Sequence, residues 1–179
     1  MKPHHAITLR TARHADQAFL LALYTSTRAD EFAQLGWPVE MERAFMRLQF
    51  EAQRTDYQRH HPSAVCQIVE LQDCPIGRLW VAQDARSLKV LDISLIADLR
   101  GQGIGTECLR RVQRSAAAAG LDVELQVAVG NPAQRLYERL GFRNVGEAGV
   151  RQAMSWKPAP LAPFAQPTTP PEEIHHEQA

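Results

Sequence analysis

The chain lacks the cysteine and histidine patterns of disulfide-stabilised and metal-binding proteins. Its three cysteines are odd in number and show no C-x-x-C spacing, so we expect reduced thiols and a cytoplasmic protein. The histidines include three adjacent pairs, at 4–5, 60–61 and 175–176, but no helical pair at metal-ligand spacing. Neighbouring side chains on a strand point apart, and we therefore expect no metal.

An excess of charge and long apolar runs are also missing. The 20 basic and 20 acidic residues give a formal net charge of zero, so no long-range field draws the chain to nucleic acid or to an anionic membrane. The uncharged apolar runs are far too short to span a bilayer, and the first seven residues lack a signal-peptide core. We expect neither a nucleic-acid nor a membrane partner.

The composition indicates one folded domain followed by a proline-rich tail. Of the 179 residues, 45% are apolar, which suits a single domain with a sizeable core. After Lys157, prolines punctuate a stretch of Ala, Thr and Gln that cannot bury enough surface to fold. We predict a domain over residues 1–157 and a flexible tail over residues 158–179.

Hydrophobic periodicity predicts strands and helices in mixed order, which is typical of an α+β fold. The expected strands cover residues 7–11, 65–71, 76–82, 88–96, 121–129, 142–147 and 151–156. The expected helices cover residues 16–27, 39–58, 106–119 and the stretch after Asn131. Asp16 is the expected N-cap of the first helix. The second helix is expected to bury apolar residues at three- and four-residue steps, namely Met41, Phe45, Leu48 and Ala52.

The most informative motif is a glycine-rich loop between an apolar strand and a helix. The segment Arg100-Gly-Gln-Gly-Ile-Gly105 leads directly into the helical stretch 106–119. Unpaired N–H groups at a helix start, together with the helix dipole, suit a phosphate or diphosphate. Glycine allows the backbone to approach such a ligand and to adopt positive φ. A tight turn without a ligand would use the same residues.

The loop matches neither of two common phosphate-binding motifs. A dinucleotide fingerprint needs G-x-G-x-x-G or G-x-G-x-x-A, and neither the frame from Gly101 nor that from Gly103 ends correctly. A P-loop needs lysine after its last glycine, but Gly105 is followed by Thr106. The pattern that fits is Arg-x-x-Gly-x-Gly, which begins at Arg100.

A second motif lies downstream of the loop. The segment Asn131-Pro-Ala-Gln-Arg-Leu-Tyr-Glu-Arg-Leu-Gly-Phe142 combines an Asn N-cap, Pro at the first helical position and a glycine stop. Capping and packing explain these residues, but they explain Tyr137 less well. In this order and at this spacing, the two motifs resemble the coenzyme A site of the GNAT (Gcn5-related N-acetyltransferase) family. The resemblance covers roughly residues 7–157.

The resemblance implies a central mixed, mostly antiparallel sheet of about seven strands with about four helices, splayed between its fourth and fifth strands. Acetyl-CoA, the acyl donor, would lie in the wedge between residues 91–96 and 122–128. Its diphosphate would bind the loop N–H groups, and its pantetheine arm would pair with strand backbone by main-chain bonds. The implied cofactor-binding residues are Ile93, Leu95, Ile96, Arg100, Gly101, Gln102, Gly103, Ile104, Gly105, Thr106 and Asn131.

The resemblance also assigns catalytic roles. Tyr137 would be the general acid that protonates the departing CoA thiolate, since a thiol pKa of ~8.5 and a phenol pKa of ~10 permit transfer in a dry site. The alternative for Tyr137 is packing of its helix onto the sheet. A strand N–H near Leu95 would hold the oxyanion.

The general base is less well defined by the sequence. Asp92 is the only carboxylate within its strand, and alternation places it with Ser94 on the face opposite Leu91, Ile93 and Leu95. The alternative for Asp92 is a solvated edge residue. Lys89 stands roughly where many relatives carry glutamate, so Glu31 and Glu40 are reserve candidates.

In the resembled family the first two helices and the turn between them set acceptor specificity. Glu31 favours a cationic amine, Trp37 could form a wall, and Arg28 could hold a carboxylate. For Trp37, packing beside Pro38 is the alternative. The sequence predicts an N-acetyltransferase acting on a primary amine of a small molecule or amino acid. A protein N-terminus or lysine as acceptor, a non-catalytic CoA-binding sensor and a homodimer stay open.

Overall fold

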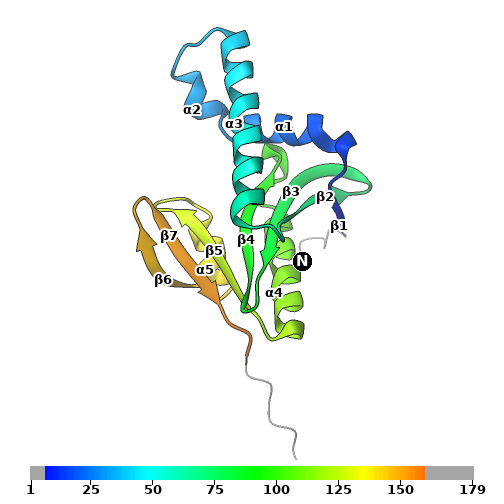
Figure 1. Ribbon diagram of the computed structural model, residues 1–179, viewed down its shortest axis with the longest axis vertical. Coiled ribbons are helices and arrows are strands. Elements are labelled where there is room, and N and C mark those ends of the chain that lie inside the picture. Colours follow the sequence, from blue (N-terminus) through cyan, green and yellow to red (C-terminus); the bar gives the residue numbers. More distant parts are fainter. Residues whose placement is uncertain (1–6, 160–179) are drawn as a thin grey trace, which may run out of the picture.

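The computed structural model describes residues 7–159, which form one seven-stranded sheet with helices on both faces (Figure 1). The strand order is β1-β2-β3-β4-β5-β7-β6, and every neighbouring pair is antiparallel except β4 and β5. The strands are β1 Ile7–Thr11, β2 Val65–Leu71, β3 Cys74–Gln83, β4 Ser87–Leu95, β5 Asp122–Ala128, β6 Arg143–Ala148 and β7 Arg151–Trp156. The predicted mixed, mostly antiparallel sheet is confirmed.

Within residues 7–159, five α-helices accompany the sheet. They are α1 Gln17–Ser26, α2 Ala29–Ala33, α3 Val39–His60, α4 Ile104–Ala119 and α5 Gln134–Arg139. Short 3₁₀ turns at His14–Asp16 and Ala97–Leu99 precede α1 and the glycine-rich loop. Helix α2 was not predicted, because five residues are too few to show a helical period. The tail predicted from residue 158 lies outside the described residues from residue 160 onward.

Two hydrophobic cores hold the helices against opposite faces of the sheet. The larger core joins α4 and α5 to the sheet through buried residues such as Leu109 and Val123. The smaller core joins α1 and α3 to β2 through residues such as Met46, Phe50 and Ile68. Among the described helices, none is both long enough and apolar enough to cross a membrane.

The buried face of α3 differs from the predicted one. Met46 and Phe50 are buried, whereas Met41 and Leu48 are 50% and 66% exposed and Ala52 is also exposed. The helix carries more than one apolar stripe, and contact with α1 and β2 decides which stripe is buried. The prediction of this face was therefore wrong, and the true face leads from Phe50 towards the functional site.

Asp16 does not cap α1 as predicted. Its carboxylate instead accepts two hydrogen bonds from the Arg10 guanidinium, at 2.7 and 2.8 Å, and one from the Arg13 backbone N–H at 2.7 Å. The side chain therefore ties the start of the 3₁₀ turn to β1. Asp16 pairs with Arg10 of the preceding strand and therefore does not cap α1.

Candidate active site

Strands β4 and β5 diverge halfway along their length. They pair in parallel only from Ser87 and Asp122 to Val90 and Leu125. At this point β4 contains an extra residue, because Val90 and Asp92 oppose consecutive residues of β3. Such a bulge bends the strand and interrupts its pairing. The result is the splay between the fourth and fifth strands that the family resemblance implied.

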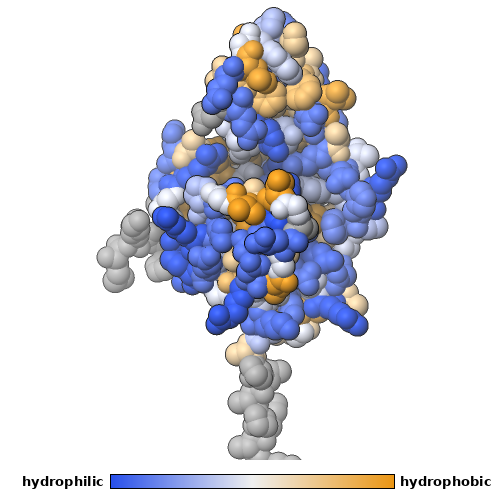
Figure 2. All heavy atoms as spheres, turned by 90° about the vertical axis from the view of Figure 1, so that its left-hand side faces the viewer, coloured by the Kyte–Doolittle hydropathy of each residue, from blue (hydrophilic) through white to orange (hydrophobic). Residues whose placement is uncertain are grey.

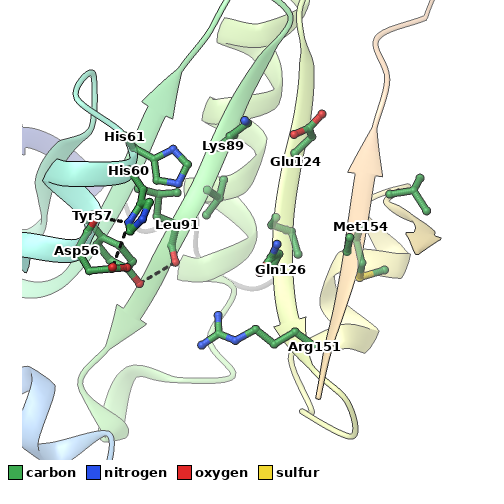
Figure 3. Close-up of a pocket in the computed structure, with 14 residues that line it drawn as sticks. Asp56, Tyr57, His60, His61, Lys89, Leu91, Glu124, Gln126, Arg151 and Met154 are labelled. Atoms are coloured by element: carbon green, nitrogen blue, oxygen red, sulfur yellow. Dashed lines mark hydrogen bonds and ion pairs between the residues drawn. The ribbon is translucent and has the colours of Figure 1, made fainter. Parts of the chain in front are cut away.

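Helix α3 holds the bulge in place. The Tyr57 hydroxyl donates a hydrogen bond of 3.1 Å to the Leu91 carbonyl (Figure 3). The Tyr57 ring also packs edge-on against Trp80 of β3, with ring centroids 5.5 Å apart. The extra residue also shifts the alternation of the strand. Leu91 was predicted to share a face with Ile93 and Leu95, but Val90 packs with these two residues on the α4 side and Leu91 is not part of that core.

The backbone of β4 presents hydrogen-bonding groups to the wedge. The Ile96 N–H donates to the Ile76 carbonyl of β3 at 3.0 Å. Alternate residues of a strand point their backbone groups to opposite sides, so the N–H groups of Ile93 and Leu95 face the wedge. The Leu95 carbonyl lies on this side too and accepts a 3.0 Å hydrogen bond from Arg100 Nε. Ile96, predicted to bind cofactor, has its N–H already occupied.

The glycine-rich loop leaves its amides free. Within residues 7–159, no acceptor receives a hydrogen bond from the backbone N–H of any residue in 101–106. The first bond into α4 is from the Glu107 N–H to the Gly103 carbonyl, at 3.0 Å. Gly101 and Gly103 adopt φ of 72° and 89°, which only glycine reaches without strain. The loop therefore aims a row of N–H groups outward at the start of a 16-residue helix.

The other residues predicted around the loop occupy its two ends. Gln102 Nε2 donates to the Asp98 carbonyl at 2.8 Å and braces the entry to the loop. Ile104 is the buried first residue of α4, and Gly105 and Thr106 are half-buried in the same turn. The Ile104 side chain packs into the larger core, so it anchors the helix start and leaves ligand contacts to the backbone.

The second motif packs on the α4 side of the sheet, where Leu136 lies beside Gly105 at the start of α4. Asn131 Oδ1 accepts the Ala133 N–H at 2.9 Å in the turn before α5, and its amide nitrogen donates to no group of the described residues. The helix itself begins at Gln134 with Ala133 as its N-cap, so the prediction of Asn131 as N-cap and of proline at the first helical position was wrong. Tyr137 is buried beside Phe142, with ring centroids 5.9 Å apart. Burial, and secondarily the Asp92 charge, raises the pKa of Tyr137 to about 12. The phenol is therefore neutral at physiological pH and carries a proton.

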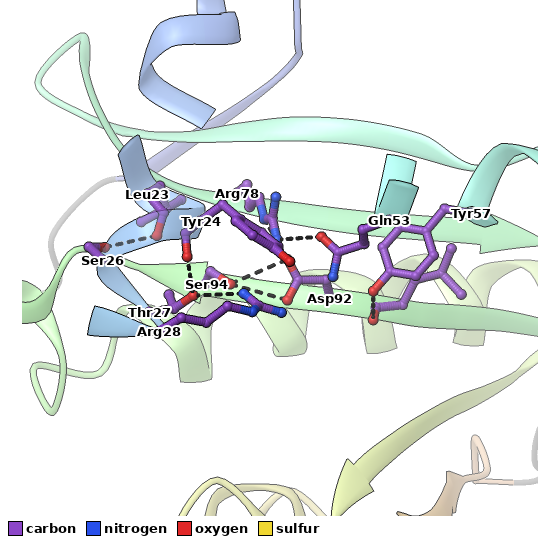
Figure 4. A network of polar contacts seen from close by, with 11 residues as sticks. Leu23, Tyr24, Ser26, Thr27, Arg28, Gln53, Tyr57, Arg78, Asp92 and Ser94 are labelled. Atoms are coloured by element: carbon purple, nitrogen blue, oxygen red, sulfur yellow. Dashed lines mark hydrogen bonds and ion pairs between the residues drawn. The ribbon is translucent and has the colours of Figure 1, made fainter. Parts of the chain in front are cut away.

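Asp92 belongs to a polar network on the opposite face of β4 (Figure 4). Its carboxylate accepts hydrogen bonds from Arg78 Nε at 2.5 Å and from Ser94 Oγ at 3.1 Å. Arg78 is 1% exposed, and its other end donates to Gln53 Oε1 at 3.0 Å. Asp92 is therefore not the solvated edge residue that the sequence left open.

A cleft of about 610 Å³ lies next to the wedge on the α3 face (Figure 3). Its walls are the C-terminal part of α3, β4, β5 and β7. The charged side chains that line it are Asp56, Lys89, Glu124 and Arg151, together with His60 and His61. Lys89 is already paired with Asp84 at 2.8 Å. Among the described residues, no group of three histidine, cysteine or acidic side chains is arranged to hold a metal ion.

The residues predicted to bind the acceptor separate into two places. Arg28 lies over the Tyr24 ring at 3.8 Å and points towards Asp92 (Figure 4). Trp37 packs instead against Phe45, with centroids 5.3 Å apart, where α2 and the start of α3 project beyond the sheet (Figure 1). Glu31 is exposed on α2. Figure 2 shows apolar side chains gathered at this projecting end, where Leu35, Val39 and Met41 are at least half exposed.

Sequence reasoning missed three residues of the site: Tyr57, Arg78 and Arg151. Arg78 did leave a signal, because it is the single charge in an apolar strand and such a charge must be paired when buried. Asp92, in the next strand, was the available partner. Tyr57 was hidden by the wrong choice of buried face on α3, and Arg151 begins a strand at the edge of the predicted domain.

A sheet splayed between β4 and β5, with free amides at the start of α4, is an arrangement that suits the binding of an acyl-CoA. A model of the acetyltransferase (GNAT) family matches residues 20–142, more than half of the chain. The chain therefore belongs to the GNAT family and is an N-acetyltransferase. Acetyl-CoA-dependent acetyl transfer is the general activity of this family. No curated protein sequence matches the chain.

Solved structures show the same fold. The PaiA N-acetyltransferase of Thermoplasma acidophilum, solved in complex with coenzyme A, superposes with a TM-score of 0.66 and 16% identity, over 85% of this chain and 99% of its own. An acetyltransferase from Thermus thermophilus gives a TM-score of 0.62 and 20% identity, over 84% and 96% of the two chains.

Proposed function

We propose that this enzyme transfers the acetyl group of acetyl-CoA directly to a primary amine of a small molecule or amino acid. One observation carries the proposal. Tyr137 is buried, and the Asp92 charge adds to the effect of burial in raising its pKa, so the proposed acid and the proposed base lie within electrostatic range of each other. They come from opposite faces of the sheet, on either side of the β4 backbone whose Ile93 and Leu95 N–H groups face the wedge.

Acetyl-CoA would bind through backbone groups. The N–H groups of residues 101–106 would receive the diphosphate, and Arg100 would add a positive charge beside it. The pantetheine arm would extend β4 by pairing with Ile93 and Leu95, in the manner of an added strand. The free amide nitrogen of Asn131 would bind it from the other side. This arrangement explains why plain aliphatic side chains suffice along β4.

The chemistry would then proceed in one displacement. The acceptor amine attacks the thioester carbonyl, and the Leu95 N–H stabilises the oxyanion. Asp92 takes the proton from the amine, directly or through a water molecule. Tyr137 gives its proton to the sulfur as the C–S bond breaks. No covalent enzyme intermediate forms, so both substrates must occupy the site together.

The size of the cleft favours a small acceptor. A volume of about 610 Å³ lies within the range of about 300–1,000 Å³ usual for small-molecule sites. The cleft walls come from α3 and β7 as well as from the two wedge strands, so the acceptor would be partly enclosed. A protein acceptor would have to present a terminus or side chain into this space.

The test is a thiol-release assay of the enzyme and its Tyr137→Phe variant against amines, amino acids, aminoglycosides and peptides. We expect CoA release with a small amine, and a loss of about 10²–10⁴ in kcat for the variant with an unchanged Kd for acetyl-CoA. Preference for peptides would favour the protein-acceptor alternative. Tight acetyl-CoA binding without CoA release, and no effect of the substitution, would contradict catalysis and favour a sensor.

A further inference from the structure

Two arginines reach the mouth of the wedge without a carboxylate partner. Arg28 follows α1, and Arg151 begins β7, more than 120 positions later in the chain. Neither forms an ion pair with any other described residue. Uncompensated guanidinium groups beside a substrate cleft are suited to binding an anion, because their planar donors match a carboxylate.

Arg28 is held in position by its neighbours. Its guanidinium stacks on the Tyr24 ring at 3.8 Å and donates to Thr27 Oγ1 at 3.2 Å. Figure 4 shows the side chain running along β4 towards Ser94 and Asp92. Asp92 is itself bound by the buried Arg78, so its charge is already shared. Arg28 therefore keeps donors that point at the place where an acceptor would enter.

Arg151 approaches from the other side. It pairs with Ala128 at the open end of β5, beyond the last contact between β4 and β5. Figure 3 shows its side chain reaching from β7 across the gap towards the Leu91 carbonyl. Arg151 makes no hydrogen bond through its side chain to any described residue. It lines the cleft together with Tyr57 and Leu91.

The two arginines flank the same stretch of β4. Arg28 extends towards Ser94 and Asp92, and Arg151 extends towards the Leu91 carbonyl (Figures 3 and 4). Burial, followed by the Asp92 charge, raises the pKa of Tyr57 to about 12, and the charges of Arg78, Arg151 and Arg28 act in the opposite direction. Of the three, only Arg78 is neutralised, by Asp92.

The remaining charges lie farther along the cleft. Asp56 is paired with His60, whose Nδ1 is 3.0 Å from its Oδ1, and Lys89 is paired with Asp84. Glu124 lies opposite Lys89 on β5, at the closed end of the parallel pairing. The wedge mouth is therefore positive and the inner end of the cleft is mixed in sign.

We propose, resting on the proposed function, that the acceptor carries a carboxylate next to its amine, as α-amino acids do, and that Arg28 and Arg151 bind this carboxylate. The amine would then lie against Asp92, beside the thioester. The side chain of the acceptor would extend into the cleft towards Glu124. Arg151 is a specificity residue that the sequence did not indicate.

The test uses matched acceptors: an α-amino acid, its carboxamide and its decarboxylated amine. For the wild-type enzyme we expect kcat/KM to be at least about 10²-fold higher for the acid. Arg28→Gln and Arg151→Gln should each raise KM for the acid about 10- to 100-fold, leave kcat/KM for the carboxamide unchanged and leave the Kd for acetyl-CoA unchanged. Arg143 is an exposed arginine of β6, and Arg143→Gln is the matched control. It should change neither the KM for the acid nor the kcat/KM for the carboxamide.

The outcomes separate this inference from the proposed function. Equal use of acid and carboxamide, or equal losses for both in the arginine variants, would overturn the inference while acetyl transfer stands. Preference for a peptide N-terminus, whose neighbouring carbonyl is an amide, would overturn it too. Acetyl-CoA binding without transfer to any of these acceptors would contradict the proposed function itself, and the inference with it.

Discussion

Arg78 and Asp92 form a nearly buried ion pair across β3 and β4, with side chains 2% and 19% exposed. The pair lies directly beneath the wedge, on the face that carries the acceptor cleft. Gln53 and Ser94 complete its hydrogen bonds, so no buried polar atom of the described side chains lacks a partner. The pair therefore joins the stability of the sheet to the placement of the candidate base.

Removing the arginine should destabilise the fold more than removing the pair. Arg78→Met leaves Asp92 partly buried without its cation, and we expect a loss of about 3–5 kcal/mol in the free energy of unfolding. The double variant with Asp92→Asn should recover part of that loss, because the uncompensated charge is gone. Urea denaturation of the two single variants and the double variant measures the coupling. Strictly additive losses would contradict the ion pair.

The raised pKa of Tyr137 should make the free energy of unfolding depend on pH. Its pKa is raised to about 12 by burial, against about 10 in the unfolded chain. The folded state holds the phenol proton more tightly than the unfolded state does. The protonated phenol therefore contributes fully to the free energy of unfolding below pH 10, and this contribution is lost as the pH rises towards 12. Between these values, wild-type stability should fall about 2–3 kcal/mol further than that of Tyr137→Phe. Denaturant titrations at several pH values give the comparison, and parallel curves would argue against a buried phenol.

The glycine-rich loop can be tested with two glycines of similar conformation. Gly103 and Gly120 have φ of 89° and 67°, and a Cβ at either position would meet nothing within 4 Å. Alanine should cost each about 1–2 kcal/mol of stability through backbone strain alone. Only Gly103→Ala should weaken acetyl-CoA binding, by about tenfold or more, because in the proposed complex the diphosphate binds the loop of Gly103 and not the turn of Gly120. Equal affinities in calorimetry would contradict that assignment.

Gly77 marks a close approach of β3 to β4 at the wedge. A Cβ there would lie 2.5 Å from the Ser94 carbonyl oxygen and 2.5 Å from Leu95 Cδ2. Gly77→Ala should therefore shift β4, cost about 1–3 kcal/mol and weaken acetyl-CoA binding. Gly146→Ala, on β6 with nothing within 4 Å, is the control and should stay within about 0.5 kcal/mol. Thermal unfolding measures the stability of both variants, and calorimetry measures their affinity for acetyl-CoA. Equal effects of the two substitutions would contradict the close approach at Gly77.

The sequence predicted the strands of this fold well because each has a clear alternation or an apolar run bounded by turn residues. The strands β1, β2 and β7 begin and end at the predicted residues. The glycine-rich loop and the Asn131 motif were also visible, since both depend on local backbone chemistry. Such signals lie within a few consecutive residues and need no knowledge of tertiary contacts.

Other features could not be predicted because they depend on contacts between distant elements. The buried face of α3 is chosen by α1 and β2, and the bulge at Leu91 appears only when β4 is aligned with β3. Arg151 acquires its place only once β7 lies beside β5. Asp16 looked like a cap until β1 supplied Arg10. In each case a partner remote in sequence overrides a local preference.

The most direct test of the account is to follow the backbone amides of the loop by NMR during titration with acetyl-CoA. We predict large shifts for the Gly101, Gly103 and Gly105 amides, as each N–H gains a phosphate oxygen, and none for those of Gly36 and Gly149. Acetyl-pantetheine, which lacks the diphosphate, should leave the loop amides unmoved. Binding of acetyl-CoA with unchanged loop amides, or no binding to the folded protein, would contradict the account.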